Sequence, residues 1–271
     1  SPLRYKCKSS ELGQEMVSTI MKARKQLGPD VVDKRGYLVL ETEARWPISE
    51  LSQLLRASTS PEDTDIRGFT FERGASDFMH AYIDGEAPRI FADLRDTFST
   101  PTDPISGFQQ WVENPPDRVA YLVCPPLKEH AINNLLDAGI RSSSRPPLPG
   151  FNELYWYVSF EANTPAPLHV EDGGAGSANL LVGGADKHWL VIHRSSASKL
   201  EKCVRKEFRQ PKPCSQFVRH YNLILSPSWL EERGISYEIV THRAGEMLVT
   251  LPGLTYHQVC NTGCNFAVAI N

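Results

Sequence analysis

The spacing of apolar residues divides the chain into a helical first part and a second part rich in short strands. Between residues 9 and 27, apolar side chains recur at every third or fourth position, which predicts an amphipathic helix. These side chains are Leu12, Met16, Ile20 and Ala23. Ser9 or Ser10 can cap this helix, and Gly28-Pro29 is expected to end it.

Two further elements are predicted before the pattern becomes ambiguous. Residues 35–43 are typical of a strand. Pro47 can begin a short helix that has Ile48 and Leu55 on its apolar face. Residues 56–117 mix helical and loop signals, and no definite element is predicted there.

From residue 118 onwards, short runs of strand-forming residues alternate with turn signals. The runs are 119–123, 154–160, 177–182, 188–193, 237–241, 246–251 and 266–270. The turn signals include Gly173-Gly174, Gly183-Gly184 and Pro252-Gly253. Two helical segments, 197–209 and 228–233, interrupt the series. Many short strands with little helix between them favour a β-sandwich or barrel over a parallel α/β sheet.

We therefore predict a mainly β protein in which an α-rich amino-terminal portion, residues 1–117, packs on a barrel formed by residues 118–271. The composition is that of an ordinary globular protein, with 41% hydrophobic and 23% charged residues. No run approaches the roughly 18 consecutive apolar residues of a membrane span. The net charge of -3 argues against a protein that binds nucleic acid through its overall charge.

Cysteine usage and the end of the sequence add two expectations. Six cysteines among 271 residues are too few for a disulfide scaffold, which favours a reducing intracellular compartment. The sequence ends at Asn271 on an apolar strand pattern, so we expect it to be part of a longer protein.

A candidate metal site begins with His169-Val170-Glu171, which follows an apolar approach and precedes a glycine-rich turn. On a strand, residues two apart point to the same face, so His169 and Glu171 would project together into the barrel. His257, in a later strand-like run, can supply a third ligand. Two histidines and one carboxylate on one face of an octahedral iron leave three positions open. A His-X-Glu sequence alone also arises by chance, so its neighbours decide the interpretation.

The neighbours of His169 resemble the metal-binding strands of the jumonji-C (JmjC) family. That family has an Asn ten residues after the first His, a Lys eighteen after it and an aromatic residue soon afterwards, and the matching positions are Asn179, Lys187 and Trp189. The stretch from Gly245-Glu246 through Tyr256-His257 to Asn261, Gly263 and Asn265 resembles the family's closing strands. Phe217-Val218-Arg219-His220 and Leu225-Ser226-Pro227-Ser228 resemble a segment of JmjC lysine demethylases. The resemblance covers residues 152–271.

The resemblance implies a double-stranded β-helix and a reaction that uses Fe(II), 2-oxoglutarate and O2. His169, Glu171 and His257 would then bind iron. Lys187 would pair with the distal carboxylate of 2-oxoglutarate, because a buried Lys is unfavourable without a partner. Asn179 would bind near the metal-binding end of the co-substrate, and Tyr121 resembles the tyrosine that donates to the distal carboxylate. The alternatives are a solvent-facing Lys, an Asn that satisfies the backbone and a plain core Tyr.

On the substrate side, Tyr157 resembles the family's tyrosine at the methyl site, and Asn271 resembles an active-site Asn of the demethylases. An aromatic face can hold a methylammonium group. Alternating aromatics in a strand are equally typical of a core, so both interpretations of Tyr157 stay open. Ala269 departs from the Ser often found at its position, which leaves the preferred methylation state open.

Cys214 and His220 resemble half of a structural zinc site of trimethyl-lysine demethylases. Zinc needs four nitrogen or sulfur ligands, and Cys203 could substitute for a missing one. Cys260 and Cys264 are expected to be buried small hydrophobes. Residues 199–214 carry six Lys/Arg against two Glu, which is typical of a solvated helix face and otherwise of a surface that contacts the phosphate backbone of chromatin.

These features predict a nuclear enzyme that demethylates methyl-lysine in histone tails or in another protein. N-methyl hydroxylation would release formaldehyde, while 2-oxoglutarate is converted to succinate and CO2. Three alternatives remain: a JmjC protein hydroxylase, a catalytically silent JmjC module that binds chromatin, and a metal-binding cupin without 2-oxoglutarate chemistry. Assays for succinate and formaldehyde discriminate among all four.

Overall fold

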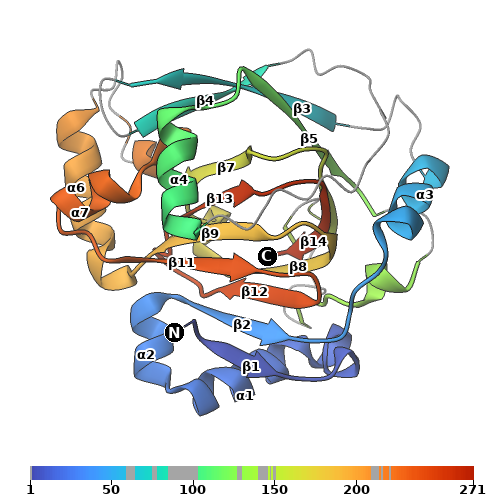
Figure 1. Ribbon diagram of the computed structural model, residues 1–271. Coiled ribbons are helices and arrows are strands. Elements are labelled where there is room, and N and C mark those ends of the chain that lie inside the picture. The colour runs from blue at the N-terminus through green and yellow to red at the C-terminus, as the bar shows by residue number, and fades with distance from the viewer. Residues whose placement is uncertain are drawn as a thin grey trace.

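A computed structural model gives the fold of the chain. It describes residues 2–58, 65–74, 78–84, 103–126, 130–139, 151–208 and 221–271, together with residues 146, 148, 214 and 216–219. The described residues form one sheet of ten strands and one of four, with helices around them (Figure 1). No helix among these residues has both the length and the apolar character needed to cross a membrane.

Eight strands of the two sheets form a double-stranded β-helix. They are β6 (Tyr155–Ser159), β7 (Thr164–His169), β8 (Ser177–Gly184), β9 (Lys187–Ile192), β11 (Tyr237–His242), β12 (Glu246–Thr250), β13 (His257–Asn261) and β14 (Asn265–Ile270). Four of them lie in the larger sheet in the order β12-β8-β14-β6, and the other four form the smaller sheet in the order β11-β9-β13-β7. All pairs within these two sets are antiparallel. The predicted mainly β, double-stranded β-helix fold is confirmed.

The larger sheet continues beyond the barrel on both sides. Next to β12 lie β2 (Tyr37–Glu41) and then β1 (Arg4–Lys6), which pairs with β2 in parallel. Next to β6 lie β5 (Arg118–Cys124), β3 (Asp65–Arg73), β4 (Phe78–Asp84) and β10 (Leu223–Leu225). Strands from residues 1–117 therefore extend the same sheet on both flanks, and the domain boundary between residues 117 and 118 stays a prediction.

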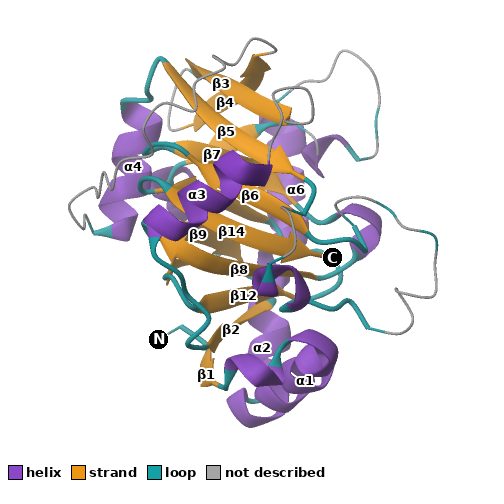
Figure 2. Cartoon of the chain, turned by 90° about the vertical axis from the view of Figure 1, so that its right-hand side faces the viewer, coloured by secondary structure: helices purple, strands orange, loops and turns teal. Residues whose placement is uncertain are grey.

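Helices surround the sheets. They are α1 (Met16–Leu27), α2 (Pro29–Arg35), α3 (Ile48–Ser58), α4 (Pro104–Glu113), α6 (Ala197–Glu207) and α7 (Pro227–Glu232). Short 3-10 turns cover Ser9–Glu11, Gly13–Glu15, Ala131–Asn134, Asp172–Gly174, Arg194–Ser196 and Phe217–Arg219. Helices α1 and α2 lie beside β1 and β2, whereas α3 lies over β8 and β14 (Figures 1 and 2).

Alternation along β9 shows how one strand serves two purposes. Trp189 and Val191 belong to one buried cluster, while Leu190 and Ile192 belong to another on the opposite face. Successive side chains of a strand point to opposite faces. Lys187 and Trp189 therefore share the face that lines the cavity described below.

The strands and helices foreseen from the sequence are largely present, with two informative differences. The helix predicted over residues 9–27 begins as two 3-10 turns, becomes α-helical only at Met16 and ends at Gly28, which has a φ of 93°. Strand β7 is absent from the predicted runs, because Pro165 and Pro167 interrupt the usual strand pattern. The strand that was expected to carry both His169 and Glu171 ends at His169. Among the described residues it is an edge strand that pairs only with β13, and prolines are tolerated at edges.

Candidate metal centre

Two histidines from neighbouring strands and one carboxylate form a cluster of metal donors. His169 ends β7 and His257 begins β13, and the two residues are direct partners in the antiparallel register. Their ring centroids lie 4.2 Å apart. Glu171 follows the end of β7 in an extended conformation. One donor atom from each of the three side chains lies within 4.8 Å of the others, and the described residues contain no other such group of three.

The backbone fixes the same tautomer for both imidazoles. Nδ1 of His169 lies 2.7 Å from the carbonyl oxygen of Pro167, and Nδ1 of His257 lies 3.0 Å from that of Thr255. A carbonyl oxygen only accepts, so each Nδ1–H donates. Each Nε2 therefore keeps a free lone pair. This arrangement is the usual one for histidines that bind metals.

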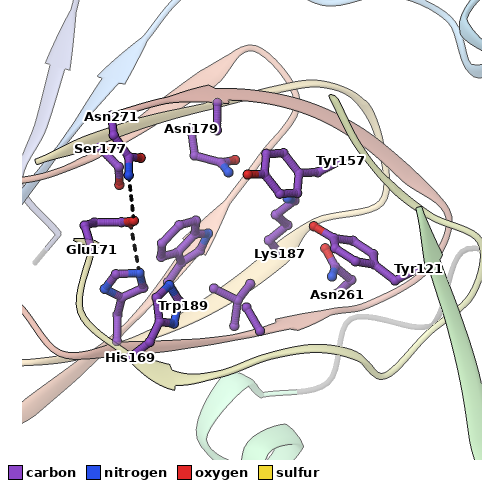
Figure 3. Close-up of a pocket in the computed structure, with 14 residues that line it drawn as sticks. Tyr121, Tyr157, His169, Glu171, Ser177, Asn179, Lys187, Trp189, Asn261 and Asn271 are labelled. Atoms are coloured by element: carbon purple, nitrogen blue, oxygen red, sulfur yellow. Dashed lines mark hydrogen bonds and ion pairs between the residues drawn. The ribbon is translucent and has the colours of Figure 1, made fainter. Parts of the chain in front are cut away.

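The charges of the cluster also suit a cation. Burial and the nearby His257 lower the pKa of His169 to about 4, so its imidazole is neutral at physiological pH. Burial alone would raise the pKa of Glu171, but its interactions with His257 and His169 lower the pKa to about 2. Oε1 of Glu171 lies 3.5 Å from Nε2 of His257. The amide of Asn271 donates to Oε2 at 3.3 Å (Figure 3).

These ligands open onto a cavity of about 100 Å³ between the two sheets. Its walls contain every iron, cofactor and substrate residue named from the sequence. The lining residues are Tyr121, Tyr157, Ala166, His169, Glu171, Ser177, Asn179, Lys187, Trp189, His257, Val259, Asn261, Ala269 and Asn271 (Figure 3).

Lys187 and Asn179 are incomplete without a ligand. The side chain of Lys187 is almost fully enclosed, and burial lowers its pKa to about 7. Within the described part of the chain, its ammonium group has no hydrogen bond or ion pair. The buried Oδ1 of Asn179 has no donor either. Buried polar groups are normally paired, so these two atoms point to a bound polar molecule.

Two tyrosines line the same cavity as Lys187. Tyr121 comes from β5 and Tyr157 from β6, and their ring centroids are 6.1 Å apart. A cation, an amide and phenol groups in one small cavity are the partners that a dicarboxylate requires. The donor set therefore fits 2-oxoglutarate as well as a divalent metal.

Sequence reasoning assigned no role to two polar residues of the cavity, Ser177 and Asn261. The hydroxyl of Ser177 lies 2.8 Å from that of Thr250 on β12. The amide of Asn261 donates to the carbonyl oxygen of Thr164 at 3.0 Å, which ties β13 to β7. The signal that could have found Ser177 is its position two residues before Asn179 on the same strand face.

The predicted zinc half-site lies partly outside the described residues. Cys214 is an exposed free thiol, and His220 lies outside the described residues. Cys260 and Cys264 are buried, as predicted. In the described part of the basic segment, Arg205 lies over the ring of Phe217 at 4.9 Å, and Glu201 accepts a hydrogen bond from Tyr256. The zinc and chromatin roles of this segment stay predictions.

The part of the chain that contains the metal-donor cluster is similar to known proteins. Residues 156–271 match the family model described as "JmjC domain, hydroxylase". Over 125 residues, 46% of this chain, the sequence is 36% identical to the "Probable lysine-specific demethylase 4F" of Homo sapiens. It is 34% identical to the "Lysine-specific demethylase 4D" of Rattus norvegicus and 33% identical to the "Lysine-specific demethylase 4B" of Mus musculus. The matched segment spans only 19%, 24% and 11% of these three proteins, respectively.

Proposed function

Because residues 156–271 belong to the JmjC domain family, we propose that this protein is an Fe(II)- and 2-oxoglutarate-dependent oxygenase that demethylates methyl-lysine in histone tails. One observation carries the proposal: a single cavity holds both a His-Glu-His donor set and a buried ammonium group without a partner among the described residues. The first feature suits the metal and the second suits the dicarboxylate.

Iron would be held by Nε2 of His169, Nε2 of His257 and the carboxylate of Glu171. Three protein ligands leave the remaining positions of an octahedral iron for co-substrate and O2. The neutral imidazole of His169 and the ionised carboxylate of Glu171 are already in the protonation states that a metal needs. The hydrogen bonds from each Nδ1 to a carbonyl oxygen hold both rings before the metal arrives.

Lys187 would bind the distal carboxylate of 2-oxoglutarate, with Tyr121 as a second donor and Asn179 nearer the metal. Bound together, the metal, 2-oxoglutarate and O2 supply an oxidation in which one oxygen atom enters succinate and the other enters a substrate C–H bond, with loss of CO2. Burial at Lys187 makes the ammonium selective for an anion, because no water shell competes for it.

Tyr157 and Asn271 would contact the methylated side chain. Tyr157 can offer its ring face to a methylammonium group. Asn271 would lie beside a bound metal, because its amide donates to Glu171. Ala269 lines the same wall with a small side chain. The matched relatives, which are named lysine-specific demethylases, support methyl-lysine as the substrate, and histone tails place the proposed activity in the nucleus.

A protein hydroxylase is the second candidate, because the matching family model itself is described as a hydroxylase. The two activities differ in the fate of the product. A hydroxylated N-methyl group breaks down to formaldehyde and leaves a shortened amine, whereas a hydroxylated carbon side chain is stable.

The test is an assay with Fe(II), 2-oxoglutarate and a panel of methylated histone peptides, with succinate and formaldehyde measured together. Equal amounts of both products are expected. Succinate with a stable product heavier by one oxygen atom would replace demethylation by hydroxylation. Neither product, from protein shown to bind Mn(II), would point to a silent module. His169→Ala is the matched inactive control.

A further inference from the structure

A buried histidine outside the cavity, His242, lies next to two residues of the cavity wall, Lys187 and Trp189. It is the last residue of β11, is fully buried and does not line the cavity. In the antiparallel register it is the direct partner of Lys187 on β9. Directly opposed residues of two strands project from the same face, so His242 stands beside the lysine.

Both ring nitrogens of His242 are engaged. The indole N–H of Trp189 donates to Nδ1 at 3.1 Å, and Nε2 lies 2.6 Å from the main-chain carbonyl oxygen of Glu246. An indole can only donate and a carbonyl can only accept, so Nδ1 is bare and Nε2 carries the proton. Burial lowers the pKa of His242 to about 3, which keeps the ring neutral at physiological pH.

Trp189 connects this histidine to the metal centre. Its ring stacks on that of His257, with centroids 5.2 Å apart and planes inclined by 30°. It also lines the cavity two residues after Lys187, on the same face of β9. The indole is therefore held at its edge by His242 and lies flat against a metal ligand.

We propose that His242 is a positioning residue for the catalytic cavity, acting through the indole of Trp189. It holds the indole as a fixed wall between the metal ligands and Lys187. The cavity measures only about 100 Å³, so an indole released from His242 takes up space that 2-oxoglutarate requires. This inference rests on the proposed function, because it assigns His242 to the pocket for the same co-substrate.

Calorimetric binding of Mn(II), followed by 2-oxoglutarate, tests the inference without turnover. His242→Leu removes both hydrogen bonds, and we expect the Kd for 2-oxoglutarate in the Mn(II)-loaded protein to rise roughly fivefold, the usual effect of one lost buried hydrogen bond. His242→Gln can still accept from the indole and donate to Glu246, so it should bind within about twofold of the unaltered protein. Should His242→Leu fail to fold, His242→Asn serves instead, because its amide is too short to reach both partners.

Leu190→Ala is the matched control. Leu190 is equally buried and adjacent to Trp189, but it belongs to the cluster on the opposite face of β9. The Leu190→Ala substitution should lower the melting temperature and leave the affinity for 2-oxoglutarate unchanged. Unaltered binding in His242→Leu, or an equal loss in Leu190→Ala, overturns the positioning role alone. Failure of the unaltered protein to bind 2-oxoglutarate overturns the proposed function and this inference with it.

Discussion

The two ends of the cavity differ in how completely the protein satisfies its own polar groups. At the metal end, both histidines donate to carbonyl oxygens and Glu171 accepts from Asn271. At the other end, the ammonium group of Lys187 and the side-chain amide oxygen of Asn179 have no partner within the described residues. The metal end is thus arranged before any ligand binds, whereas the Lys187 end is completed by its ligand. Substitutions at the two ends should therefore have separable effects.

The largest effect is expected at the metal end. Glu171→Ala removes one of three protein ligands and should abolish turnover, with no detectable succinate from 2-oxoglutarate. The fold should persist, because the buried clusters lie elsewhere. Asp172→Ala, which removes the exposed neighbouring carboxylate, is the control and should retain activity. Full activity in Glu171→Ala would contradict the metal assignment.

A substitution at the other end should affect the co-substrate and spare the metal. Lys187→Ala should raise the 2-oxoglutarate concentration needed for half-maximal turnover at least roughly tenfold. Breaking one side of a buried charge pair typically costs about 3–5 kcal/mol, and tenfold corresponds to only about 1.4 kcal/mol. Titration of Mn(II) should give the same affinity as in the unaltered protein. Equal weakening of both ligands would mean that the two ends are not separable.

The pH dependence of stability sharpens the same contrast. Burial lowers the pKa of Lys187 from 10.5 to about 7, so between these values the unfolded chain binds more protons than the folded chain. Stability of the ligand-free protein should therefore rise with pH across this window. Lys187→Met removes the contribution of this ionisable group to the pH dependence of stability. Its melting temperature should exceed that of the unaltered protein at pH 7 and approach it near pH 10, and a constant difference would contradict the buried charge.

A smaller effect is expected from Asn271→Ala. The substitution removes the amide that donates to Glu171, while all three metal ligands remain. Loss of such an outer partner should weaken Mn(II) binding by roughly tenfold, at the lower end of the usual range. Calorimetric titration measures this loss. An unchanged Mn(II) affinity would show that the carboxylate is oriented without Asn271.

The smallest effect on the cavity is expected from Cys214→Ser. Cys214 is exposed and does not line the cavity, so Mn(II) binding there should stay the same. The same pair of proteins tests the predicted zinc half-site by elemental analysis. Less zinc in the Cys214→Ser protein would support a zinc site shared with His220. Equal zinc content in the two proteins would contradict this zinc site.

The sequence predicted the location of the cavity better than its surroundings. The resemblance to the JmjC family singled out His169, Asn179 and Lys187, and all three side chains line the cavity. Strand β7 is absent from the predicted runs, because its two prolines interrupt the strand pattern although a sheet edge tolerates them. Strands β3 and β4 lie within residues 56–117, where helical and loop signals are mixed in the sequence. The pairing of β3 with β4 and with β5 depends on contacts with other strands, which the local sequence does not show.

The contribution of His242 could not be predicted from the sequence. Its hydrogen bond with Trp189 joins residues 53 positions apart and depends on the register of β11 against β9. A single histidine in a strand does not indicate which residue on another strand it will contact. Register is set by turn geometry and by burial on both faces, and neither is readable from one residue.

The prolines of β7 have a consequence for the behaviour of the protein in solution. An edge strand presents unpaired main-chain donors that can recruit a strand from another molecule. Pro165 and Pro167 have no N–H to offer, and β7 is the edge of the smaller sheet. Strand β7, which carries the first metal ligand, therefore disfavours pairing with a strand of another molecule. The metal-binding face can stay accessible to substrate without promoting aggregation along this edge.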